Sequence, residues 1–220
     1  MVGIVTIDDA IDVIQDENTE DIEKMAAIVP TDKPYFKTGV LETFLKRIPW
    51  LLLLMVSATF TGMIITGFED KLARYVVLTS FIPMLMDTGG NAGGQSSVTI
   101  IRGMSLGDIA LKDVLRVIWK EMRVSVLCGV ALAAVNFAKI MLIDRLLLGN
   151  QDVNAMVAVV VCLTILIAVF IAKLIGCTLP ILAKAVGFDP AVMASPFITT
   201  IVDAISLFAY FMLAQWLLNI

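Results

Sequence analysis

The amino-acid sequence predicts an all-α membrane protein with five transmembrane helices. Of its 220 residues, 59% are hydrophobic, and the mean hydropathy is +0.93. A typical soluble domain is only about 45–50% apolar. The apolar residues also gather in long runs, each near or above the roughly 20 residues that cross a bilayer as a helix. Short charged loops separate these runs, as in a multi-pass protein.

Composition and charge exclude several functional classes. The net charge of −4 gives no basic face, so we expect no nucleic-acid partner. The chain has no histidine, and its cysteines, Cys128, Cys162 and Cys177, are scattered through apolar runs. We therefore expect no zinc-type site, and any bound metal must use oxygen ligands.

The chain divides near Pro34 into a polar part and an apolar part. A β-branched run, Val2–Ile7, precedes an amphipathic helical pattern, but residues 1–30 are too few for a core of their own. We interpret residues 1–30 as the end of a cytosolic domain, residues 31–47 as a linker with a short helix, and residues 48–220 as the membrane domain.

The membrane domain is expected to contain five spans. They are Ile48–Phe68, about Tyr75–Ile101, about Val124–Ile143, about Val153–Ala185 and Pro190–Ile220. Lys173 and Pro180 interrupt the fourth run, so that helix is expected to be broken or tilted. In the loop at 102–123, apolar and charged residues alternate with a pattern typical of a short interfacial amphipathic helix.

Basic residues in the short loops predict the orientation. Lys37, Lys46 and Arg47 precede the first span, and five basic residues lie in the 102–123 loop, whereas acidic residues balance the basic ones in the opposite loops. By the positive-inside rule, the N-terminus is cytoplasmic. An odd number of spans then places the C-terminus outside a cell (inner) membrane.

A polar stripe follows the second span. Its members, spaced four residues apart, are Asp87, Asn91, Gln95 and Thr99. Residues at this spacing share one face of a helix. Two glycine pairs at the same spacing, Gly89/Gly93 and Gly90/Gly94, would let another helix approach closely and leave backbone carbonyls open to a cavity.

The fifth span carries a second stripe. Its members are Thr199, Asp203, Ser206 and Tyr210, with Thr200 beside them. At about 1.5 Å per residue, Asp203 and Asp87 both lie roughly 21–22 Å from the cytosolic ends of their spans. This equal depth predicts one shared site of carboxylate, amide, hydroxyl and carbonyl oxygens, which suits a hard cation such as Mg²⁺, Ca²⁺ or Mn²⁺.

A purely structural interpretation of these polar residues is also open. Amides and hydroxyls in membrane helices often only bond to neighbours, and spaced glycines often only pack helices. Asp203 resists that interpretation because its own span holds no lysine or arginine to pair with it. Lys173 is expected either to extend to the interface or to pair there.

Residues 35–220 resemble the MgtE family of magnesium channels and transporters. The motifs that carry the resemblance are G-G-N-x-G-x-Q over 89–95 and D-P-A…P-F…T-T-x-x-D from Asp189 to Asp203. The resemblance implies a homodimer in the lipid bilayer, with five helices per subunit and a pore along the dimer axis. It implies a transporter of Mg²⁺ and not an enzyme.

The resemblance also implies site residues. The aspartate that matches Asp203 binds hydrated Mg²⁺, and Thr99 matches a position that lines the same site. With the two stripes, the expected metal-site residues are Asp203, Asn91, Thr99, Thr199, Gln95 and Gly90. Some relatives have a second asparagine where this chain has Gly94, and no role is carried over to Asp87.

The segment GIVTIDD looks like the end of a CBS domain, which in this family precedes the membrane part. In the family, cytosolic Mg²⁺ closes the pore through acidic cytosolic domains and a connecting plug helix, for which Thr38–Arg47 is the matching place. With most of the sensing domain absent, we expect weak closure by cytosolic Mg²⁺.

Two other functions are open to the sequence. One is a proton- or sodium-coupled carrier of another divalent cation (Mn²⁺, Ca²⁺ or Co²⁺), which flux under an imposed pH gradient would reveal. The other is an intramembrane aspartyl protease, because Asp87-Thr88-Gly89 spells D-T-G and two carboxylates could share a proton. Against the protease, this D-T-G lies in a long apolar helix, and Asp203 lacks the G-x-G-D context.

Overall fold

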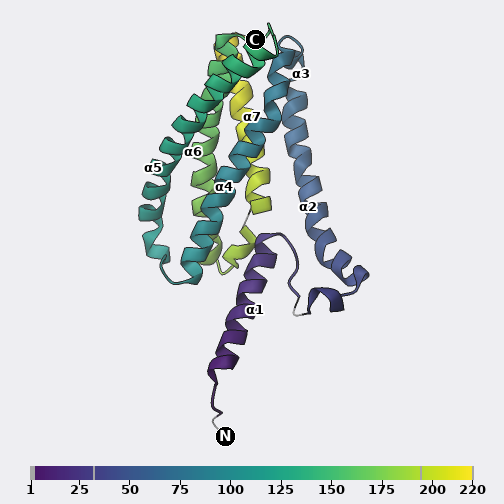
Figure 1. The fold of residues 1–220 in the computed structure, drawn as a ribbon, viewed down its shortest axis with the longest axis vertical. Helices are drawn as coiled ribbons and strands as arrows, with labels where there is room; N and C mark the ends of the chain where they lie inside the picture. Colours follow the sequence, from purple (N-terminus) through teal and green to yellow (C-terminus); the bar gives the residue numbers. More distant parts are fainter. Residues whose placement is uncertain (1–2, 32, 194, 220) are drawn as a thin grey trace.

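A computed structural model describes residues 3–31, 33–193 and 195–219 of the chain, and the described part is helical without strands (Figure 1). The long helices are α1 (Ile7–Met25), α2 (Val40–Gly67), α4 (Ile82–Ser105), α5 (Val114–Lys139), α6 (Ala155–Ala185) and α7 (Ser195–Leu218). Short segments join them: η1 (Tyr35–Lys37), α3 (Glu69–Leu72), η2 (Val76–Phe81), η3 (Leu111–Asp113), the π-helical η4 (Ile140–Leu147) and η5 (Pro190–Met193).

Four of the helical segments are long and apolar enough to cross a membrane. They are Val40–Gly67, Leu111–Leu147, Ala155–Ala185 and Pro190–Leu218. Helix α4, which covers most of the second predicted span, has 24 residues but is too polar to meet the same criterion. That α4, the second predicted span, crosses the membrane therefore stays a prediction.

Two expectations about local structure are wrong. Residues 102–123 do not form a separate interfacial helix, because α4 continues to Ser105 and α5 already begins at Val114. Helix α6 is not broken, since it runs through both Lys173 and Pro180, and of the two alternatives only the tilt stays a prediction. Of the predicted β-branched run, residues 3–6 are non-helical without strand pairing, Ile7 begins α1, and residues 1–2 lie outside the described part.

Helices α4, α5, α6 and α7 pack side by side, and α6 contacts the other three (Figure 1). The core is built from fully buried aliphatic side chains on α6, including Val157, Val161 and Val169, with Leu85 of α4 and Val202 of α7. In a bilayer, close van der Waals packing drives such association, because lipid tails are as apolar as the side chains they would replace.

Glycines set the distance between the central helices. A Cβ atom on Gly176 of α6 would lie 2.2 Å from the carbonyl oxygen of Gly93 on α4. A Cβ on Gly93 would in turn lie 2.8 Å from Ile198 Cγ2 of α7 and 3.1 Å from the Ala172 carbonyl oxygen of α6. The backbones of α4 and α6 therefore touch directly at Gly93 and Gly176.

The first part of helix α2 diverges from the other membrane helices, and most of the apolar side chains of α2 are exposed (Figure 1). Farther along, Leu54, Ser57 and Phe60 of α2 line a pocket together with residues of α7. Helix α2 approaches α7 near its C-terminal end, where the ring of Phe68 stacks on Phe211 with centroids 4.9 Å apart. Close by, Lys71 of α3 donates a hydrogen bond to Gln215 of α7.

Helix α1 extends away from the bundle, and its C-terminal end contacts it (Figure 1). A capping box between Thr6 and Asp9 fixes its start. At its other end, Lys24 forms ion pairs with Glu20 of the same helix and with Asp189, which precedes η5. Burial alone would raise the pKa of the Asp189 carboxyl, but hydrogen bonds from Lys24 and from the Ala191 N–H hold it below its ordinary value.

Substituting Gly176 by alanine should force α4 and α6 apart. Overpacking of this kind costs about 1–3 kcal/mol, so G176A should unfold at a lower temperature in detergent. Gly62 of α2 is the matched control, because a Cβ there meets nothing within 4 Å. The close-contact interpretation fails if G176A and G62A unfold at the same temperature as the parent chain.

Substituting Lys24 by methionine should loosen the attachment of α1. The ion pair with Asp189 is partly exposed, so the expected loss is only about 0.2–1 kcal/mol, seen as faster hydrogen exchange in α1. Lys33→Met removes the exposed pair with Glu42 instead and should leave α1 unchanged. Equal exchange in all three chains would contradict a docking role for Lys24.

Candidate ion site

One face of α4 is polar and uncovered in the single chain. The four side chains of the predicted stripe, Asp87, Asn91, Gln95 and Thr99, are all exposed. The opposite face is buried and rich in small residues, including Gly89, Gly93 and Ser97. The structure therefore confirms that the stripe occupies a single helical face and shows that the rest of the chain leaves these four side chains exposed.

Four of the residues that the sequence singled out come together between α4 and α7. A Cβ on Gly90 would lie 2.7 Å from Thr199 Cγ2, so these two residues are in direct contact. Asp203 lies one turn beyond Thr199 on α7, and Asp87 lies three residues before Gly90 on the antiparallel α4. Because Gly90 contacts Thr199 and Gly89 contacts Val202, the antiparallel helices place Asp87 and Asp203 on the same side of this contact.

One oxygen of the Asp203 carboxylate is left unsatisfied by the described part of the protein. Its side chain is half-buried, and its Oδ1 atom is buried without a hydrogen-bond partner among the described residues. No lysine or arginine in the described ranges forms an ion pair with Asp203 or Asp87. Two uncompensated carboxylates in an apolar region favour occupation by a cation.

The remaining predicted site residues lie farther along α4. The Thr99 hydroxyl donates a 2.7 Å hydrogen bond to the Gln95 carbonyl of its own helix. Both side chains face the same side as Asn91. Gln95 lies one turn beyond Asn91 and Thr99 lies two turns beyond it, in the direction away from Asp87. In the part of the chain that the structure describes, no three His, Cys, Asp or Glu residues form a metal-binding group. One chain thus offers a lining of a carboxylate pair, amides and hydroxyls, and no closed metal cage.

The stripe predicted along α7 is shorter than expected. Ser206 is buried and faces Gly89, whose Cβ would lie 3.1 Å from the serine Oγ. Tyr210 is fully buried, and its hydroxyl donates a 2.9 Å hydrogen bond to the Leu78 carbonyl. These two residues therefore belong to the packed interior, because α4 and η2 cover that side of α7.

The D-T-G sequence has no protease-like geometry. Asp87, Thr88 and Gly89 all lie within α4, and the Thr88 hydroxyl donates to the Met84 carbonyl one turn earlier. In soluble aspartic proteases this motif occupies a turn after a strand. The helical conformation removes the main support for the protease hypothesis.

A second polar cluster, which the sequence pattern did not indicate, lies inside the bundle. Ser96 of α4, Glu121 of α5 and Lys173 of α6 form a buried hydrogen-bonded network. Lys173 therefore pairs and does not extend to the interface. Glu121 was missed because the 102–123 segment was read as a loop, whereas its second half belongs to α5.

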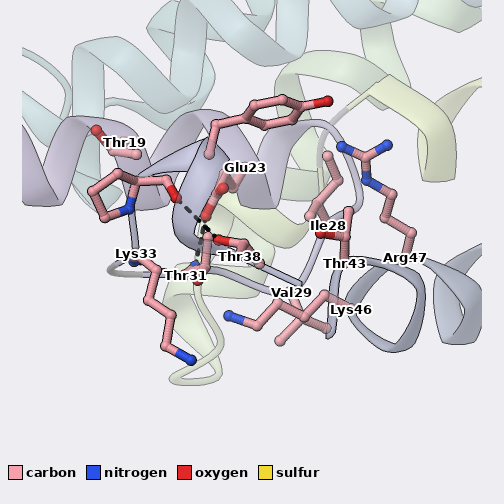
Figure 2. Close-up of a pocket in the computed structure, with 12 residues that line it drawn as sticks. Thr19, Glu23, Ile28, Val29, Thr31, Lys33, Thr38, Thr43, Lys46 and Arg47 are labelled. Carbon is pink, nitrogen blue, oxygen red and sulfur yellow. Dashed lines mark hydrogen bonds between the residues drawn. The ribbon is translucent and has the colours of Figure 1, made fainter. Parts of the chain in front are cut away.

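A pocket near the start of α2 lies away from this site (Figure 2). Lys33, Lys46 and Arg47 line it together with Glu23 and several threonines. Lys33 is already paired with Glu42, and the Lys46 ammonium donates to the Pro30 carbonyl. Because two of its basic groups are engaged and Glu23 adds a negative charge, the pocket is a weak candidate for an anion site.

Comparison with known proteins points to one family. The profile of the MgtE family, described as a divalent cation transporter, matches residues 82–213. The chain is 36% identical over 219 residues to the magnesium transporter MgtE of Thermus thermophilus, covering 100% of this chain and 47% of that protein. It is 37% identical over 215 residues to the magnesium transporter MgtE of Bacillus subtilis, covering 97% and 45%.

The chain spans about half the length of these curated relatives. The family match begins at the first residue of α4 and extends into α7, so it contains both helices that form the candidate ion site. By this match, the chain belongs to the MgtE family of divalent cation transporters.

Proposed function

We propose that this chain forms the ion pathway of a Mg²⁺ transporter, with α4 as a fifth membrane-spanning helix. The observation that carries the proposal is the uncovered polar face of α4 beside the uncompensated carboxylate of Asp203. An exposed polar face in a bilayer is costly unless it lines a water-filled path. The names of the two relatives support Mg²⁺ as the transported ion.

A second copy of the chain would complete the path. The stripe on α4 is the part of the central bundle that stays polar and uncovered, and a twofold partner would place an identical polar face opposite it. The pore then lies on the dimer axis, and each subunit contributes Asp203, Asn91 and Gln95. A dimer also doubles the carboxylates, which compensates for the lack of a closed metal cage in one chain.

The residue types fit an ion that keeps part of its water shell. Mg²⁺ dehydrates reluctantly and usually keeps several waters while one or two carboxylates bind it. In the proposed site, Asp203 supplies the attracting charge. The Asn91 and Gln95 amides, the Thr199 and Thr99 hydroxyls and the Gly90 carbonyl contact ion-bound waters. Oxygen ligands also suit Mn²⁺, Ca²⁺ and Co²⁺, so selectivity depends on the spacing of this lining.

The basic residues of the loops support a cytoplasmic N-terminus and an external C-terminus. In this arrangement residues 1–30 belong to a cytosolic sensing domain, and residues 31–47 connect it to the pore. In the structure residues 40–47 form the first two turns of α2, and among the described residues of 31–39 the helical segment is the short η1. Movement of the cytosolic part would therefore act directly on the base of α2.

Replacing Asp203 by asparagine should reduce Mg²⁺ flux into proteoliposomes by at least about tenfold, since losing 1.4 kcal/mol of ion attraction already has that effect. Asparagine keeps the size and removes the charge, so folding should survive. The matched control is Asp152→Asn, in an exposed loop. Equal flux in D203N and the parent chain would refute Asp203 as the ion-binding group.

The same flux assay distinguishes a coupled carrier from a pore. A proton- or sodium-coupled carrier would change its Mg²⁺ flux when a pH or sodium gradient is imposed, whereas a pore follows only the Mg²⁺ gradient and the membrane potential. Gradient-dependent flux that D203N abolishes would favour the carrier.

A cysteine at position 95 should cross-link two subunits. Gln95 is on the uncovered face of α4, so in a cysteine-free background Q95C chains should form dimers with a short bis-maleimide in the membrane. Leu127→Cys on α5 is the control, because that side chain is exposed away from α4 and α7. Preferential cross-linking through position 127 would place the dimer axis elsewhere.

A further inference from the structure

Three polar side chains from three different helices meet inside the bundle. The Ser96 Oγ donates a 2.6 Å hydrogen bond to Glu121 Oε2, and the Lys173 ammonium donates a 3.2 Å hydrogen bond to the Ser96 Oγ. Lys173 Nζ also lies 3.7 Å from Glu121 Oε2. We call Ser96, Glu121 and Lys173 the Ser96 network. All three residues are buried, with 2%, 8% and 5% exposure.

An internal ion pair of this kind is a poor source of stability. Removing both charges from water costs about as much as their attraction returns, so apolar residues of similar size would often serve as well. Ionisable residues at membrane depth are therefore expected to have a functional reason. The Ser96 network is not part of the proposed ion path, because its members are buried on the faces of α4, α5 and α6 that pack together.

The packing around the Ser96 network indicates that the network could hold α4 in a fixed rotation against α6. One turn from Ser96 and from Lys173, the contact between α4 and α6 consists of the Gly93 and Gly176 backbones. The contact between these glycines brings the helices close without side chains that interlock, and apolar side chains of the two helices pack together farther along, in the cluster of Ile100 and Met104 with Cys177 and Ile181. Hydrogen bonds and ion pairs depend on direction, so they resist rotation and sliding that the glycine contact tolerates.

The rotation of α4 matters for the ion path. Successive residues on a helix are about 100° apart, so Ser96 faces the interior while its neighbour Gln95 faces the uncovered side. Asn91 lies one turn from Gln95 on the same side. Holding the Ser96 side chain between Glu121 and Lys173 therefore also fixes the directions in which the two amides point.

We propose that the Ser96 network is a positioning device that fixes the rotation and depth of α4, and thereby sets the selectivity for Mg²⁺ over Ca²⁺. This inference rests on the proposed function for its consequence in transport. Mg²⁺ requires nearly ideal octahedral geometry, whereas Ca²⁺ accepts variable geometry. A pore wall that can rotate would thus lose Mg²⁺ preference before it loses conduction.

The first experiment measures selectivity. Ser96→Ala removes the bridging hydroxyl, and the double variant Lys173→Met/Glu121→Gln removes both charges without leaving one unpaired. Each should lower the Mg²⁺ preference over competing Ca²⁺ by roughly three- to tenfold, the range expected for one net hydrogen bond. The control Ser125→Ala removes a buried hydroxyl that bonds only within α5. Ser96→Thr keeps a hydroxyl and should restore the preference.

The second experiment measures the rotation of α4 without transport. In a cysteine-free background, a water-soluble maleimide should label Asn91→Cys, on the uncovered face, and spare Ala92→Cys, which is buried. Adding Ser96→Ala or the double variant should bring the two labelling rates together. Unchanged labelling in both network variants overturns the proposal.

The flux and labelling measurements test the proposed ion pathway and the positioning role of the Ser96 network separately. If D203N and the parent chain transport equally, the proposed function fails, and the labelling still decides whether the network positions α4. If D203N abolishes flux while S96A and the double variant keep the parent's selectivity and its labelling pattern, the network is only structural and the positioning proposal fails.

Discussion

The close backbone contact between α4 and its neighbours is the constraint on which the rest of this structure depends. Gly93 and Gly176 let α4 and α6 touch, and Gly90 admits Thr199 of α7. Without Cβ atoms at these positions, van der Waals contact extends along the helices, which is the main attraction available between helices in lipid. Because α4 makes its helix contacts through the glycines on one face, its opposite face needs no apolar side chains and can be polar.

Because its two faces differ, α4 contacts two different groups of buried polar side chains. Toward the interior, the charges of Glu121 and Lys173 compensate each other through Ser96. Toward the uncovered side, Asp203 keeps a buried oxygen without a partner among the described residues. A compensated network is suited to holding helices in place, whereas an uncompensated carboxylate is suited to attracting a mobile cation. The same helix takes part in both, so positioning and ion attraction are mechanically linked.

The outer helices α1 and α2 are attached by local side-chain contacts and not by close backbone packing. Helix α2 approaches α7 through aromatic stacking at one end, and α1 meets the bundle through Lys24 and Asp189. Both contacts are local and leave most of each helix uncovered. Elements held this way can move with a small loss of contact, in contrast to the glycine-packed centre. That difference fits a central bundle that stays fixed while the outer helices α1 and α2 move.

The sequence by itself determined the helical class, four of the five predicted spans, the polar stripe on α4 and the close approach expected of its glycines, because these follow from local composition and helical periodicity. It did not place Glu121 in a helix, and it could not show that Ser96, Glu121 and Lys173 meet, since they lie 25 to 77 residues apart. Nor did periodicity show that Tyr210 turns inward to Leu78 while Asp203 stays half-buried. Only the tertiary structure decides which side of a helix is covered, because that depends on neighbours contributed by distant segments of the chain.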